Sequence, residues 1–142
     1  MRRFLLLALV ASVLVVPAEA GASLSGCRTL DVARVARSPL GVVVYKFHHV
    51  KRWCWKYPRI TYVRSYTYVS DLDEYTIRYG GVSAAMGYMY RWCCGSSTSG
   101  HFSLRQGSFS NCFWKFGCWR VDHPWIRIWA HGNGSYTTRT GT

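Results

Sequence analysis

Tryptophan, arginine and lysine recur together along this chain and are its most distinctive chemistry. Residues 51–57 read Lys-Arg-Trp-Cys-Trp-Lys-Tyr, and residues 125–129 read Trp-Ile-Arg-Ile-Trp. Aromatic faces stack on sugar rings or bases and attract cations, while arginine and lysine attract anionic groups. The pattern therefore predicts a binding surface, and the predicted residues are Lys51, Trp53, Trp55, Arg64, Trp125, Arg127 and Trp129.

Strand alternation leaves two orientations open for these tryptophans. If Cys54 points into the core, Trp53 and Trp55 lie on the outer face with Lys51. In the other orientation the tryptophans fill the core, as large apolar side chains commonly do, and Cys54 lies outside. The first orientation is the one that gives a binding surface. Residues 62–68 repeat the pattern, with Tyr62, Arg64, Tyr66 and Tyr68 on one face.

Nucleophilic catalysis has no motif in this sequence. There is no Gly-x-Ser-x-Gly, and the serines of residues 95–100, His101 and the Asp122-His123 pair are only scattered fragments of a Ser-His-Asp site. Carboxylates are also too few to favour a glycosidase, which needs two of them around one bond. We predict no catalytic residues, and a hydrolase is the least favoured of the functions considered.

Metal binding is equally unsupported by spacing. His48 and His49 are neighbours in a predicted strand and should point to opposite faces. No His-x-x-x-His or Cys-x-x-Cys pair occurs. Asp71-x-Asp73-Glu74 lacks the rest of a calcium loop and is more typical of a solvated turn. We predict neither a metal nor a cofactor.

The N-terminus has the pattern of a secretory signal peptide. Basic residues 1–3 precede an apolar run from Phe4 to Val16, then Pro17 and the small-x-small sequence Ala18-Glu19-Ala20. An uncleaved membrane anchor is the alternative, but the run is short for a bilayer. We expect residues 1–20 to be removed near Ala20, and no later segment is apolar enough for a transmembrane helix. The sequence therefore predicts a secreted protein.

Six cysteines follow the predicted leader, at positions 27, 54, 93, 94, 112 and 118. An even number outside the cell predicts three disulfides. We expect Cys54 to pair with Cys112, because both lie in strand-like segments. Cys27, Cys93, Cys94 and Cys118 would then form the other two. A bridge between the adjacent Cys93 and Cys94 is strained and less favoured.

Charge and composition suggest the partners. The formal net charge is +12, and loss of two arginines and one glutamate with the leader leaves +11. Such a charge favours an anionic polymer or carbohydrate of a cell envelope, although solubility alone also explains it. The excess of arginine, with abundant valine, alanine and glycine, is typical of a GC-rich bacterial genome. The alternative is a secreted effector directed at another protein, with the loop 95–100 as its contact.

The elements that would position these residues are mostly strands. The alanine-rich segment Thr29–Arg37 predicts one short helix within an N-terminal lead at 21–40. From residue 41 to 142 the pattern predicts an antiparallel β-sandwich, immunoglobulin-like or related, with an Asn-Gly hairpin turn at 132–134. A bulge at Gly107 would place Phe102, Leu104 and Phe109 on one face. Strands are expected from Gly41 towards Trp55, with Pro58 as the break, and at 60–69, 74–79, 86–93, 102–112, 125–130 and 135–139.

Three segments together resemble a family. They are Trp53-Cys54-Trp55, the Gly107-x-Phe109-x-x-Cys112 segment, and Pro124-Trp125 followed by the turn at 132–135. In these the chain resembles small exported bacterial proteins of unknown function. The resemblance covers most of the mature chain and implies export and a disulfide-linked β domain. It implies no activity and no functional residue.

Overall fold

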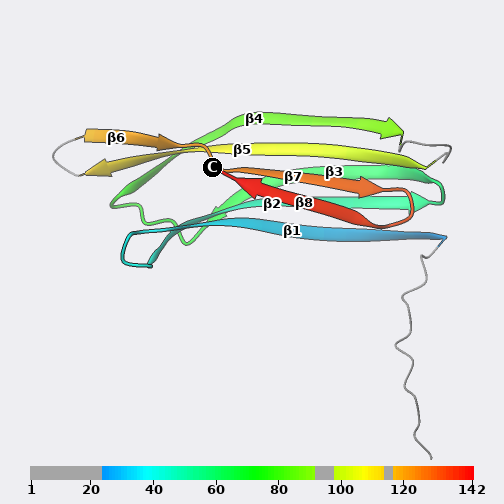
Figure 1. Ribbon diagram of the computed structural model, residues 1–142, viewed down its shortest axis with the longest axis horizontal. Helices are drawn as coiled ribbons and strands as arrows, with labels where there is room; N and C mark the ends of the chain where they lie inside the picture. Colours follow the sequence, from blue (N-terminus) through cyan, green and yellow to red (C-terminus); the bar gives the residue numbers. More distant parts are fainter. Residues whose placement is uncertain (1–23, 92–97, 114–116) are drawn as a thin grey trace, which may run out of the picture.

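The computed structural model describes residues 24–91, 98–113 and 117–142, which fold entirely as strands and turns (Figure 1). The predicted leader, Cys93, Cys94 and residues 95–97 lie outside the described residues. Within the described ranges, no helix has the length and apolarity to cross a bilayer. The strands are β1 (Ser25–Arg37), β2 (Val43–Lys56), β3 (Arg59–Ser70), β4 (Ile77–Arg91), β5 (Ser99–Phe113), β6 (Gly117–Asp122), β7 (Trp125–His131) and β8 (Tyr136–Gly141).

Two antiparallel sheets share these strands. The first has the order β1-β2-β3, and the second has the order β4-β5-β7-β8 with β6 also paired to β5. Figure 1 shows β4 along one long side of the molecule and β1 along the other. The central strands β2, β5 and β7 supply buried residues that pack together between the two sheets. The prediction of an antiparallel all-β fold is confirmed, and the immunoglobulin-like subtype stays a prediction.

The predicted helix at Thr29–Arg37 is wrong, because this segment lies within strand β1. It pairs with β2 in an antiparallel register that runs from Ser25–Lys56 to Arg37–Val43. Leu30, Val32 and Ala36 pack against the buried core, as alternate residues of a strand do. The pairing with β2 and this burial outweigh the modest helix propensity of alanine and arginine.

The expected bulge lies on β4, not at Gly107. The pairing of β4 with β5 shifts register on either side of Val82, which lies opposite Gly107. Gly80-Gly81 therefore does not separate two strands, and β4 continues through it with Gly81 at φ 94°. Because β5 keeps its alternation, Phe102 lies on the outer face and Phe109 on the inner one. The prediction that these two residues share a face is wrong.

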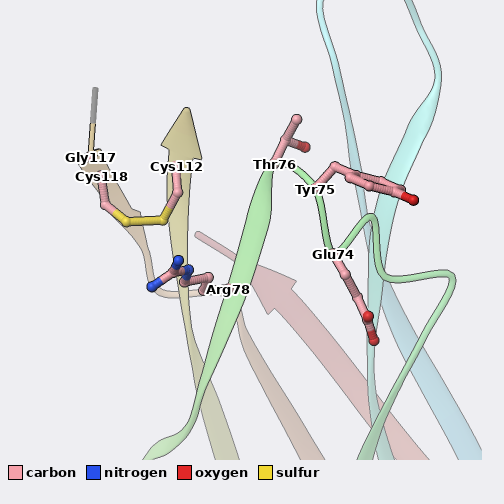
Figure 2. A pocket seen from close by; sticks show the side chains of 7 residues that line it. All are labelled: Glu74, Tyr75, Thr76, Arg78, Cys112, Gly117 and Cys118. Atoms are coloured by element: carbon pink, nitrogen blue, oxygen red, sulfur yellow. A yellow bond between two sulfur atoms is a disulfide. The ribbon is translucent and has the colours of Figure 1, made fainter. Parts of the chain in front are cut away.

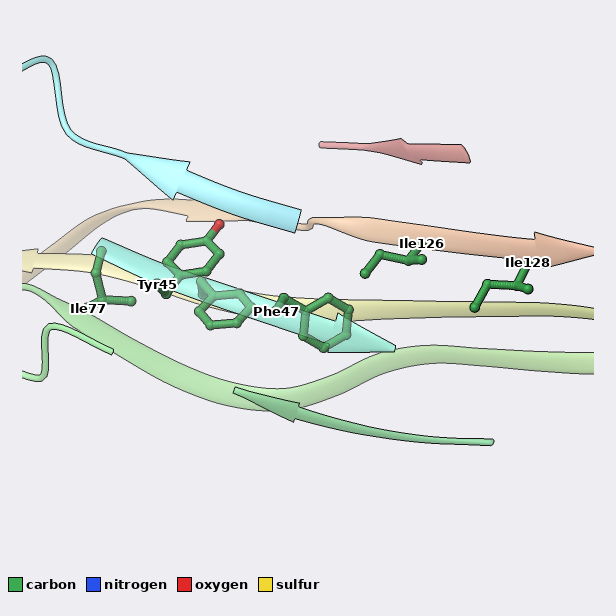
Figure 3. Packing of buried hydrophobic residues seen from close by; sticks show 6 residues of the cluster. Tyr45, Phe47, Ile77, Ile126 and Ile128 are labelled. Atoms are coloured by element: carbon green, nitrogen blue, oxygen red, sulfur yellow. The ribbon is translucent and has the colours of Figure 1, made fainter. Parts of the chain in front are cut away.

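The interior of the molecule is built from alternate residues of facing strands (Figure 3). Tyr45 stacks on Phe109 with ring centroids 3.8 Å apart, and Phe47 meets the same ring edge-on. Ile126 and Ile128 of β7 complete this cluster and are fully buried. Each such side chain contributes about 1.5–3 kcal/mol through burial. Gly107 leaves the space that the rings need, since a Cβ there would lie 2.7 Å from Phe109.

Strands β7 and β8 are joined by the predicted Asn-Gly turn. Gly134 has φ 83°, a left-handed conformation that glycine adopts without strain. The Asn133 side chain accepts a hydrogen bond from the Ser135 amide at 3.0 Å. This turn fixes the register in which β8 covers the edge of β7.

Candidate binding face

Three of the seven predicted binding residues lie inside the protein. Lys51 and Trp53 are fully buried, and Trp55 is 8% exposed. Trp53 and Trp55 form a second buried cluster with Ala130 of the opposite sheet. The outward orientation predicted for these tryptophans is therefore wrong, because the inner face of the first sheet takes the larger apolar side chains.

Cys54 lies on the outer face of that sheet, and its partner is Cys27. The two residues are directly opposite in the β1–β2 register and form a disulfide. Cys112 is bonded to Cys118 across the β5–β6 pair. The predicted Cys54–Cys112 bridge is therefore wrong. The expectation that the other two disulfides are formed among Cys27, Cys93, Cys94 and Cys118 is wrong for the same reason.

Lys51 joins the two sheets through its buried amino group. Its Nζ donates hydrogen bonds to the carbonyl oxygens of His101 at 2.6 Å and Ile128 at 3.2 Å. Burial, reinforced by the charge of Arg105, lowers the pKa of Lys51 to about 7. Burial likewise lowers the pKa of the nearby His49 to about 4. This lysine is a structural residue and cannot reach a ligand in solution.

Trp125, Arg127 and Trp129 lie on the outer face of the second sheet, as predicted for inward-pointing Ile126 and Ile128. The register aligns them with outward residues of β4, β5 and β8. One row across the sheet is Met86, Leu104, Arg127 and Arg139, and the next is Tyr88, Phe102 and Trp129. We call these residues, with Trp125, the aromatic–arginine face.

Rings and guanidinium groups are in contact across this face. Phe102 lies between Tyr88 and Trp129, with ring centroids 5.0 and 5.3 Å apart. The Arg127 guanidinium lies 4.5 Å from the centre of the Trp125 ring, and that of Arg139 lies 5.9 Å from Trp129. In cation–π contacts of this kind the cation lies over the face of the ring, and the edge of the ring stays in solvent.

The aromatic–arginine face is partly open to solvent and lacks acid, and Phe102 at its centre is only 8% exposed. Met86 is 52% exposed and Tyr88 55% exposed, while Trp125 and Trp129 are partly exposed. Its eight residues include two arginines and no carboxylate. Met86 and Tyr88 were predicted to share a face, but Phe102, Leu104 and Arg139 were missed as members of the surface. The alternation of β5 and β8 would have identified them once the sheet order was known.

Arg64 lies on the other side of the molecule. It belongs to β3 in the first sheet, opposite Arg52, and its outward neighbours Tyr62, Tyr66 and Tyr68 are exposed as predicted. The seven predicted binding residues therefore form no single surface. Three lie on the aromatic–arginine face, three in the interior and one on the opposite sheet.

The fragments considered for catalysis or metal binding are not brought together. His123 is exposed, whereas Asp122 is bonded to Arg120 and to Asn111. His48 and His49 point to opposite faces of β2, and the described residues contain no cluster suited to a metal. Asp73 accepts hydrogen bonds from the Tyr75 amide and the Thr76 hydroxyl, as in an ordinary turn.

A cavity of about 600 Å³ lies at the end of the molecule that holds the Cys112–Cys118 disulfide. Figure 2 shows the Arg78 side chain beside this disulfide and Glu74 across the start of β4. Tyr75, Thr76 and Gly117 complete the lining. The cavity mixes one cation with one carboxylate and has none of the stacked rings of the aromatic–arginine face.

No family model, curated protein or solved structure matches this chain. The resemblance to small exported bacterial proteins therefore stays a prediction.

Proposed function

We propose that this protein is a secreted binding module whose aromatic–arginine face holds an anionic or carbohydrate polymer of a bacterial cell envelope. The observation that carries the proposal is the partly open, acid-free surface on which Arg127 and Arg139 lie over tryptophan rings. Sugar rings would pack against ring faces that the arginines leave uncovered, such as that of Tyr88, and the two guanidinium groups would bind acidic substituents. Export is supported by the leader-like residues 1–20, and the two disulfides among the described residues are compatible with it.

Matched tyrosines on the two outer faces provide the test. Tyr88 on the proposed face is 55% exposed and Tyr66 on the opposite face is 51% exposed. We expect Tyr88→Ser to weaken binding to isolated cell wall, or to a soluble acidic glycan, by about 3- to 10-fold, because one aromatic contact is lost. Tyr66→Ser should bind as the unaltered protein does.

Arginine variants give the corresponding test of charge. Arg139→Gln should weaken binding to an acidic glycan more than binding to a neutral one such as dextran, while Arg64→Gln on the opposite face should affect neither. Retention of no polymer at low salt would overturn the proposal. Equal losses from the variants of both faces would overturn the assignment of the site.

A second candidate function is binding to another secreted protein through strand β4. This strand is at the end of its sheet and has only β5 as a neighbour among the described residues. Residues 79–90 carry no charge, and Val82, Met86 and Met89 are all more than 40% exposed. Long, uncharged edges are able to pair with a strand of a partner. A charged substitution such as Ala85→Lys should abolish this kind of binding and leave polymer binding intact.

A further inference from the structure

A serine, a histidine and an aspartate form a hydrogen-bonded chain on the outer face of the first sheet. The His48 Nδ1 atom lies 3.0 Å from Asp31 Oδ1, and its Nε2 atom lies 2.9 Å from Ser70 Oγ. The Tyr68 hydroxyl donates to the other carboxylate oxygen, Asp31 Oδ2, at 2.6 Å. The Tyr68 ring also stacks on the imidazole, with centroids 4.1 Å apart.

The sheet itself positions these groups. His48 lies on the central strand β2, opposite Ala33 of β1 and Tyr68 of β3. Asp31 and Ser70 are each two residues from those partners, so both share the face of His48 and lie diagonally on either side of it. A single antiparallel register therefore aligns the three groups from three consecutive strands. No loop is needed to bring them together.

The order of atoms fixes the direction of the hydrogen bonds. An ionised carboxylate only accepts, so the proton of neutral His48 is on Nδ1 and is donated to Asp31. Its Nε2 atom then accepts a hydrogen bond from the Ser70 hydroxyl. This is the arrangement in which an imidazole removes the proton of a serine nucleophile. Tyr68 stays a donor to Asp31, since this hydrogen bond and the nearby carboxylate raise the pKa of Tyr68 to about 12.

We infer that Ser70 is the nucleophile of an acyl-transfer site, with His48 as its general base and Asp31 and Tyr68 as positioning residues. The substrate class is an ester approached from solvent. The hydroxyl oxygen of Ser70 forms a bond to the ester carbonyl carbon while its proton passes to His48 Nε2. The bond to the leaving alcohol breaks, and that alcohol takes the proton from His48. Water then releases the acid by the same steps in reverse.

A second serine–histidine pair in the molecule lacks what this site has. Ser103 Oγ lies 3.4 Å from His49 Nε2, but both residues are fully buried, and among the described residues His49 Nδ1 has no hydrogen-bond partner to orient the ring. By contrast, the side chain of His48 is 13% exposed and that of Asp31 43% exposed. Access to solvent and a carboxylate at Nδ1 thus distinguish the outer chain from the inner pair.

A cation stands beside the proposed nucleophile. Lys46 is directly opposite Ser70 in the register and on the same face, and its ammonium lies 2.6 Å from Asp71 Oδ2. Asp71 has φ 51°, so the chain turns sharply just after Ser70. The part of the Lys46 charge that Asp71 does not offset would stabilise the negative oxygen that develops on the attacked carbonyl. Lys46→Met should slow acylation without removing it.

The experiment is active-site labelling of the full chain with a fluorophosphonate, followed by mass spectrometry, and hydrolysis of p-nitrophenyl acetate. We expect the fluorophosphonate adduct to form on Ser70. In Ser70→Ala both the adduct and the hydrolysis of p-nitrophenyl acetate should be lost. His48→Gln should slow labelling by at least about 100-fold, the usual contribution of a general base. Ser83→Ala removes an exposed serine whose hydroxyl donates to the Gln106 and Gly107 carbonyl oxygens, and this variant should still be labelled at Ser70 at the normal rate. Unlabelled Ser70, or equal labelling rates with and without His48, would overturn the inference.

Asp31 needs a separate readout because its loss could also disturb packing. The Nδ1 proton of His48, held by a carboxylate, should give a downfield resonance in the proton NMR spectrum. Asp31→Asn should remove this resonance and slow labelling, and Asp31→Glu should restore part of both. If Asp31→Asn leaves both the thermal transition and the labelling rate unchanged, Asp31 does not position His48. None of these results depends on the aromatic–arginine face, which lies on the other sheet.

Discussion

Three basic side chains, Lys51, His49 and His131, are buried in the folded protein. Lys51 and His49 are fully buried between the sheets, and His131, which contacts Tyr90, is 4% exposed. Burial lowers the pKa of His49 and His131 to about 4 and that of Lys51 to about 7. The folded protein therefore holds these bases in their neutral form at a pH where the unfolded chain protonates them.

The stability of the fold should consequently depend on pH through Lys51. Its pKa is about 7 when folded and 10.5 ordinarily, so between these values the unfolded chain binds more protons. Unfolding free energy should rise with pH across this window by up to about 1.4 kcal/mol per unit. Lys51→Met should remove this slope in denaturation curves measured from pH 7 to 9. Lys56→Met, which alters an exposed lysine, should keep it, and a slope that survives in Lys51→Met would contradict the assignment.

The histidines act in a lower pH window with the same sign. His49 and His131 change from an ordinary pKa of 6.5 to about 4 on folding, because burial disfavours their charged forms. Stability present above pH 6.5 should be lost as the pH falls towards 4. His49→Gln should flatten this acid limb in urea titrations followed by tryptophan fluorescence. The exposed His123→Gln is the control, and an equal effect of both would refute the burial argument.

At the scale of elements, the local pattern is informative where apolar and aromatic residues alternate and misleading for the alanine-rich and arginine-rich β1. Strands β2, β3 and β7 fall close to their predicted ranges, because β-branched and aromatic residues alternate along them. Strand β1 was predicted as a helix, since its alanines and arginines favour one locally. Its true state is set by β2, which no local window contains.

Which face of a strand is buried also depends on strands that lie far away in the sequence. The sequence indicates that Trp53 and Cys54 point to opposite faces of the strand, but not which of these faces is exposed to solvent. The Asp31–His48–Ser70 chain was missed for a related reason, since Asp31 had been placed in a helix. Only the register of three strands reveals that these residues are neighbours.

The two described disulfides should stabilise these elements unequally. Cys27–Cys54 spans 27 residues and ties β1 to β2, whereas Cys112–Cys118 spans 6. In the chain-entropy model their removal costs about 3–4 and about 2 kcal/mol, because the longer loop restricts the unfolded chain more. We expect Cys27→Ala with Cys54→Ala to lower the urea midpoint more than Cys112→Ala with Cys118→Ala. The reverse order would show that native packing, not loop closure, decides the difference.

At the scale of the whole molecule, the two sheets present outer faces of different character. The first sheet carries a carboxylate within a polar network, and the second carries arginine over tryptophan without acid. With a formal charge of +12 for the chain, both faces attract anions at long range. On the second sheet, Tyr88, Phe102 and Trp129 from three neighbouring strands are in ring contact, and a polymer would be held there at short range.

Salt separates these long-range and short-range contributions. The Debye length falls from about 10 Å at 0.1 M to about 3 Å at 1 M, so attraction by the net charge should vanish over this range. Binding of an acidic glycan should therefore weaken strongly as salt rises, while binding of a neutral glycan through the stacked rings should change little. Arg139→Gln should make the salt dependence for the acidic glycan shallower, because one cation at the contact is gone. If affinity for the acidic glycan is independent of salt, charge does not drive binding, and an uncharged contact such as the β4 edge becomes the better assignment.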